Sequence, residues 1–171
     1  MISTKVRFAV LALVAVLLIW ALYEKSYEGA ALAGLGIVLL VRGYFKDGTV
    51  VLAAKAFRNK DYQKAETLLK EVPNPDYLRK KRRGYYEFIY GNIELQKQNY
   101  AEAETHFQIA SRFPLASEND KGIILVHLAN INLRKKEYQR VRAYVERAKE
   151  LKISTRIQGI IQKIEKEIPG A

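Results

Sequence analysis

Apolar and polar positions repeat at a fixed interval through the chain after residue 46. Tyr62, Tyr100 and Tyr138 are 38 residues apart, and each ends a short polar stretch and begins an amphipathic run. A small or β-branched residue follows each tyrosine by three positions, and another small residue precedes it by nine: Ala65, Ala103 and Val141, and Ala53, Gly91 and Ala129. Fixed periods of this length are typical of stacked helical repeats, so we predict three helical hairpins.

The middle copy has the most specific spacing. Its small, aromatic and terminal residues are Gly91, Ala103, Phe107, Ala110 and Pro114. This pattern resembles the tetratricopeptide repeat, which has a small residue in its first helix, an alanine and an aromatic in its second, and a terminal proline. The resemblance implies helix pairs that approach closely at the small residues, with the aromatic filling the space between neighbouring repeats.

The chain also departs from that family. Its period is 38 residues, whereas the family's is about 34, and the difference is about one helical turn. Glu87 and Glu94 stand where the family has tryptophan and tyrosine. The first copy is weaker, with Leu69 and a displaced Pro73, and the third copy lacks a terminal proline. An ordinary helical bundle is the alternative fold.

The predicted repeat domain covers residues 47–171. We expect repeats at about 47–76, 77–115 and 116–153, and a capping helix at 154–168. Isoleucines recur at helical spacing in the capping helix and form one apolar stripe: Ile157, Ile160, Ile161, Ile164 and Ile168. A helix that is apolar on one side can cover the exposed end of a stack of repeats.

Residues 1–46 differ in composition. Two uncharged stretches, 8–23 and 29–41, are separated by the polar residues 24–28. Although each is shorter than the ~20 residues that a bilayer needs, the pair predicts a transmembrane helical hairpin. The predicted fold is therefore all-α, with an N-terminal two-helix transmembrane hairpin followed by an α-solenoid. The alternatives are a cleaved signal peptide for the first stretch and a re-entrant or surface helix for the second.

Basic residues predict the orientation of that hairpin. Lys5 and Arg7 precede the first stretch and Arg42 and Lys46 follow the second, while the loop has one lysine and two glutamates. The positive-inside rule then places both ends and the repeat domain in the cytoplasm, as in an integral protein of a bacterial inner membrane. The absence of cysteine agrees with a reducing compartment. With reversed topology, the chain would be a periplasmic or lumenal assembly factor.

The chain is basic, with a net charge of +11. Its densest basic block is Arg79, Lys80, Lys81, Arg82 and Arg83. Five consecutive residues cover every side of a helix, so this block is either a solvated helix end or a contact with anionic lipid headgroups. The aromatic residues that follow are typical of a helical core, so we expect no nucleic-acid partner.

The sequence shows no catalytic or metal-binding constellation. His106 and His127 are the only histidines, no cysteine is present, and no acid stands at ligand spacing beside either histidine. A glycine-rich phosphate loop is also absent from the sequence. We therefore expect neither enzymatic activity nor a cofactor.

The family resemblance implies a binding groove along the first helices of the repeats. Its inward residues would be Tyr85, Phe88, Asn92 and Gln96 in the middle copy, and Ile123, Val126, Asn130 and Arg134 in the third. In the family, asparagines placed like Asn92 and Asn130 often bond the backbone of an extended peptide; a water-lined groove is the alternative. Phe88 and Val126 stand where a carboxylate-clamping lysine would be needed, so no such clamp is expected.

These features together predict a membrane-anchored docking or scaffold protein without catalytic activity. Its partner would be a protein or an extended peptide segment. The alternative is a basic module that orients the domain on an anionic lipid surface.

Overall fold

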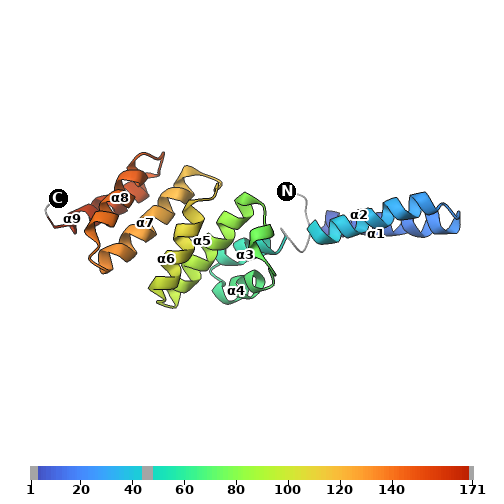
Figure 1. Ribbon diagram of the computed structural model, residues 1–171, viewed down its shortest axis with the longest axis horizontal. Coiled ribbons are helices and arrows are strands. Elements are labelled where there is room, and N and C mark those ends of the chain that lie inside the picture. Colours follow the sequence, from blue (N-terminus) through green and yellow to red (C-terminus); the bar gives the residue numbers. More distant parts are fainter. Residues whose placement is uncertain (1–3, 44–47, 170–171) are drawn as a thin grey trace. The chain divides into compact units, whose positions relative to one another are not determined.

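The computed structural model describes residues 4–43 and 48–169, and these residues are all-α, as predicted (Figure 1). The chain divides into two compact units between Gly48 and Thr49. The first unit contains α1 (Thr4–Tyr23) and α2 (Tyr27–Gly43). The second contains α3 (Thr49–Arg58), α4 (Tyr62–Lys70), the 3-10 helix η2 (Pro75–Tyr77), α5 (Lys80–Gln96), α6 (Tyr100–Ser111), α7 (Glu118–Arg134), α8 (Tyr138–Lys149) and α9 (Thr155–Lys166).

The first unit is a hairpin of α1 and α2. Glycines of α2 lie against α1: a Cβ atom added at Gly34 would be 3.7 Å from Leu18, and one at Gly36 would be 3.8 Å from Val14. Large apolar side chains of both helices are exposed, among them Leu32 with 72% of its surface accessible.

The prediction that this hairpin spans a membrane is wrong. Among the described helices, none combines the length and the apolar character that crossing a bilayer requires. With its 17 residues, α2 rises only about 26 Å, against a hydrocarbon core of about 30 Å. The uncharged part of α1, residues 8–23, rises only about 24 Å.

The predicted localisation depended on a membrane-spanning hairpin, so it is wrong as well. This applies to the integral-membrane assignment, to the bacterial inner membrane, to the cytoplasmic orientation and to the alternative with reversed topology. The side chains of Lys5, Arg7 and Arg42 and the whole of Lys46, on which the orientation rested, lie outside the described residues.

The three hairpins of the second unit share one turn geometry. Each turn has one residue in the left-handed region, with φ of 62°, 64° and 60°: Lys60, Gln98 and Lys136. In the middle turn, the Gln98 N–H bonds the Leu95 carbonyl at 3.0 Å and the Asn99 N–H bonds the Glu94 carbonyl at 2.9 Å. This pair of bonds is a Schellman motif. The next helix starts at the following tyrosine, so the sequence period of 38 is also a period of the backbone.

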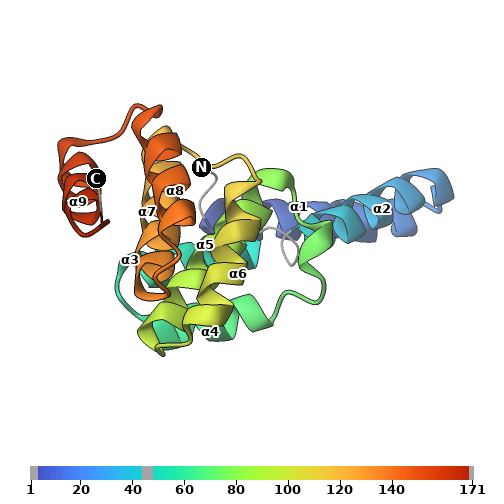
Figure 2. The same ribbon diagram turned by 60° about the vertical axis from the view of Figure 1, so that its left-hand side comes forward.

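Close contact between Gly91 and Phe107 joins α5 to α6. Phe107 is fully buried, and a Cβ atom at Gly91 would be only 2.8 Å from its ring. On its other side, the ring stacks on His127 of α7 with the centroids 4.9 Å apart. One aromatic side chain therefore contacts both its own hairpin and the next, which lie side by side in Figure 2.

Helix α9 covers the last hairpin at the position of the predicted capping helix. Its isoleucine stripe packs against α7 and α8, with Ile157, Ile161 and Ile164 buried. The segment before α9 is tied to the first turn of α7, because the Lys152 N–H donates to Glu118 Oε2 at 2.6 Å and the Ser154 N–H donates to Asn119 Oδ1 at 2.9 Å. These bonds place α9 beside α7.

Candidate functional site

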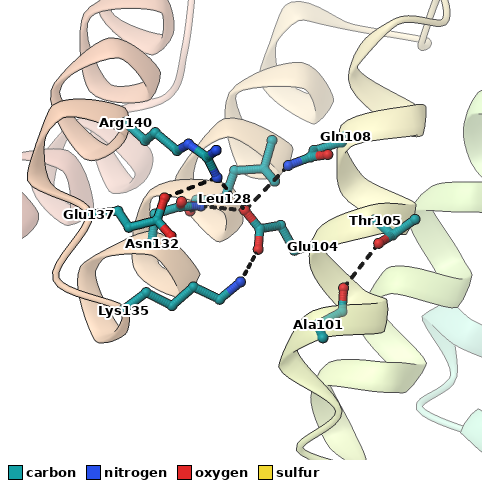
Figure 3. Close-up of polar contacts among 9 residues, drawn as sticks. All are labelled: Ala101, Glu104, Thr105, Gln108, Leu128, Asn132, Lys135, Glu137 and Arg140. Carbon is teal, nitrogen blue, oxygen red and sulfur yellow. Dashed lines mark hydrogen bonds and ion pairs between the residues drawn. The ribbon is translucent and has the colours of Figure 1, made fainter.

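Buried polar contacts hold α6 against the last hairpin (Figure 3). Glu104 of α6 is buried, accepts a hydrogen bond from Asn132 Nδ2 at 2.9 Å and pairs with the Lys135 ammonium. The Arg140 guanidinium lies 3.9 Å away. Burial raises the pKa of Glu104, but the bonds from Lys135 and Asn132 outweigh it, and the pKa lies below its usual value. A charged Glu104 thus fixes the second repeat on the third.

A matching network lies one period earlier in the sequence. Lys97 Nζ is 2.9 Å from Glu66 Oε1 and 3.0 Å from Glu94 Oε1, and joins α4 to α5. One period after Glu104 stands Arg142, whose guanidinium donates to the Pro169 carbonyl at 3.0 Å, beyond the end of α9. Glu66 and Glu104 are therefore structural, because each holds one repeat in register with the next. Helix α9 ends the stack.

A first cavity lies beside the second half of α7, with a volume of about 470 Å³. Its lining includes Tyr100, His127, Asn130, Ile131, Arg134 and Glu167. The Arg134 guanidinium donates to the Tyr100 hydroxyl at 2.7 Å and lies 4.6 Å from the centre of its ring. No acid within the described ranges forms an ion pair with Arg134. The cavity therefore contains a fixed guanidinium whose charge is not neutralised by an ion pair.

A second cavity of about 420 Å³ lies between α7 and α9. Four aliphatic side chains line it: Ile123 and Val126 from α7, and Ile157 and Ile160 from α9. Asn119, Ser154 and Arg156 add polar atoms to the lining. This cavity is suited to an apolar side chain that has a polar or charged neighbour.

His127 lines both cavities, which therefore adjoin along α7. Burial lowers the pKa of His127 to about 4, so its imidazole is neutral at pH 7. Its ring stacks on Phe107 with an angle of 11° between the planes. The centre of the site is thus a neutral aromatic side chain held by the core.

The predicted groove residues of the third repeat meet at these cavities. Ile123 and Val126 line the second cavity, while Asn130 and Arg134 line the first. Asn130 is exposed, and its side chain forms no hydrogen bond within residues 4–43 and 48–169. Its amide is therefore available to a ligand.

The predicted groove residues of the middle repeat have other contacts. The Tyr85 hydroxyl donates to Asp120 Oδ2 at 2.8 Å, and Phe88 packs in the core against the ring of Phe57, 6.0 Å away. Asn92 Nδ2 donates to the Phe88 carbonyl of its own helix at 2.8 Å, and Gln96 is exposed. None of these four lines the two cavities.

The basic block at the start of α5 does not form one continuous surface. Arg79 occupies the N-cap position, and Lys80 and Lys81 are exposed. Arg82 is half-buried, whereas the Arg83 side chain turns inward, 2.7 Å from Glu87 Oε1 and 2.5 Å from Asp76 Oδ1. The block is therefore split between solvent and the structure of the hairpin.

Some lining residues were not predicted from the sequence. In the sequence, His127 stands out only by the lack of ligands around it, and Tyr100 only as a marker of the period. Arg156 precedes the isoleucine stripe and Glu167 lies between its last two members, Ile164 and Ile168, and the approach of both to α7 depends on how α9 docks. The stripe indicated a covering helix but gave no signal for the side of α7 on which it lies.

The histidines do not create a metal site in the part of the chain that the structure describes, since no cluster of three potential ligands occurs there. His106 Nδ1 lies 2.6 Å from Glu87 Oε2, a partner that the sequence did not indicate because it lies on the preceding helix. The ring of His106 stacks on Tyr90 with the centroids 5.1 Å apart. His106 and Glu87 therefore join α5 to α6.

No protein-family model, curated protein or solved structure matches this chain. Membership of the tetratricopeptide family stays a prediction.

Proposed function

We propose that this chain is a non-catalytic docking protein that binds an extended segment of another protein along α7. The observation that supports this most is the pair of adjoining cavities beside α7, which share His127. Helix α9 walls the second cavity, and Glu167, just past the end of α9, lines the first. The residues of α7 that line the two cavities extend from Asn119 to Arg134, a stretch of helix about 22 Å long. An extended chain of about seven residues has that length.

The lining suits a polypeptide. Asn130 presents both a donor and an acceptor, which is what a peptide backbone requires of a single side chain. Aliphatic walls between α7 and α9 can take a side chain, while Arg134 and Arg156 offer charged donors. In peptide recognition, hydrogen bonds to the peptide backbone usually provide affinity, and pockets for its side chains provide specificity.

A selection experiment tests this proposal. The full chain, kept in a mild detergent because α1 and α2 expose apolar side chains, is used to enrich a displayed library of random peptides. Binding of the enriched peptides is then measured to the chain and to Asn130→Trp, which places a large side chain in the first cavity. Arg147→Trp is the matched control, because Arg147 is exposed on α8 and lines neither cavity.

We expect Asn130→Trp to weaken the binding of the enriched peptides at least tenfold and Arg147→Trp to leave their binding unchanged. Circular dichroism of both variants establishes that their helices are intact. Equal binding to the chain and to folded Asn130→Trp would show that the peptides dock elsewhere and would refute the proposal.

A further inference from the structure

We infer that the docked segment is acidic at two points about seven residues apart and aliphatic between them. This inference rests on the proposed function, because it names the class of segment that the same site would bind. It follows from where the site places its charges and its apolar walls.

The two cations of the site lie in different cavities. Arg134 is the last residue of α7 and lines only the first cavity, while Arg156, in the first turn of α9, lines only the second, together with Asn119 from the first turn of α7. Throughout the described ranges, neither guanidinium forms an ion pair with an acid. Arg156 shares the second cavity with Asn119, which lies about 22 Å from Arg134 along α7, and we take this length as the spacing of the two acids.

Aliphatic surface occupies the space between these cations. Ile123 and Ile160 are only partly buried, from opposite walls of the second cavity, so a side chain placed there would cover both. A volume of about 420 Å³ admits a side chain as large as leucine. The cavity gains most from an aliphatic residue, because burial of apolar surface is favourable whereas an unpaired polar group would lose its hydration.

The remaining charges agree with an acidic partner. His127 is neutral at pH 7 because burial lowers its pKa to about 4, so it adds no third cation to the described residues that line the two cavities. Glu167 is the one acid among the described lining residues, and it is exposed at the edge of the first cavity. The whole chain carries a net charge of +11, which steers acidic segments toward it.

Three labelled synthetic octapeptides test the inference by fluorescence anisotropy with the full chain. The first has glutamate at both ends and two leucines between, with serine elsewhere and both termini blocked. The second has lysine in place of both glutamates, and the third has serine in place of both leucines. We expect the first peptide to bind at least tenfold more tightly than either of the others.

Charge variants of the protein locate the contacts. Arg134→Gln and Arg156→Gln should each weaken the binding of the first peptide by about two- to fivefold, which is the range for a surface ion pair. Arg147→Gln removes the same charge from α8 and should have no effect. Glu167→Gln should strengthen the binding of the first peptide and weaken the binding of the lysine peptide, since it removes the acid at the edge of the first cavity.

The outcomes separate this inference from the proposed function. Tighter binding of the lysine peptide, no binding of any octapeptide, or equal effects of Arg134→Gln and Arg147→Gln would overturn the acidic class. The docking proposal would still stand if library peptides without acids lost their binding to Asn130→Trp. If the library peptides bind folded Asn130→Trp as tightly as the unchanged chain, both the inference and the docking proposal are overturned.

Discussion

Replacing Gly91 with alanine tests the close approach of α5 and α6 on which the repeat is built. The new Cβ atom would lie 2.8 Å from Phe107 Cε1, 2.9 Å from Cδ1 and 3.0 Å from Cζ. Phe107 is fully buried, with Phe88 and His127 against it, so its ring has no free space into which it could move. Either the ring or the helix must therefore shift.

The magnitude follows from two opposing effects. Overpacking of a buried contact costs about 1–3 kcal/mol, while alanine is favoured over glycine within a helix by about 0.5–1 kcal/mol. We therefore expect Gly91→Ala to lower the free energy of unfolding by roughly 1–2 kcal/mol. Gly159 is the matched control in α9, because a Cβ atom there has no heavy atom within 4 Å. Gly159→Ala should stabilise the protein by about 0.5–1 kcal/mol.

Urea unfolding followed by far-ultraviolet circular dichroism measures both changes. A second comparison uses Phe107→Leu, which removes Cε1 and Cζ, two of the three ring atoms nearest to Gly91. In that background Gly91→Ala should lose most of its cost, and the double-mutant cycle should give a coupling of about 1 kcal/mol. If Gly91→Ala stabilises the protein as much as Gly159→Ala does, the close approach of α5 and α6 is not present in solution.

Three further changes probe the turns, the inter-repeat contacts and the buried histidine. Gln98→Gly should stabilise the fold by about 0.5–1 kcal/mol in urea unfolding, because Gln98 has φ of 64° and is exposed; destabilisation would contradict the left-handed turn. Glu104→Ala should cost roughly 3 kcal/mol, since it leaves Asn132 and Lys135 without their buried partner; a loss below about 1 kcal/mol would show that the network contributes little. His127 binds its proton less readily in the folded state, with a pKa of about 4 against 6.5, so stability should fall between pH 6.5 and 4 by up to roughly 3 kcal/mol. In thermal unfolding His127→Gln should remove much of that slope, and an unchanged slope would place its origin in other groups.

The local geometry of the hairpins was largely readable from the sequence. Tyr62, Tyr100 and Tyr138 mark the residue that follows each left-handed turn, and a feature fixed by three or four neighbouring residues leaves its pattern in the sequence. The close pair Gly91 and Phe107 was likewise indicated by the period and by the resemblance. The transmembrane prediction failed because it counted uncharged residues, whereas spanning depends on the length of one apolar helix: α2 has only 17 residues.

The candidate site was readable only in part. Ile123, Val126, Asn130 and Arg134 share one side of α7, and helical spacing alone predicts that they lie together. The same positions in the middle repeat line neither of the two cavities: Tyr85 bonds Asp120, and Phe88 packs into the core. A period assigns equivalent positions to two repeats, but the neighbours of each repeat decide whether those positions remain open.

The sequence by itself determined the three hairpins, their turns and the existence of a covering helix, because periodicity and turn chemistry act over a few residues. Only the tertiary structure decided that α9 docks beside α7 and so encloses a cavity with Ile123 on one wall and Ile160 on the other. It also brought Glu104 to Lys135 and His127 to Phe107. Contacts of this kind depend on the packing angle and register between helices, which result from many side chains at once and leave no local pattern.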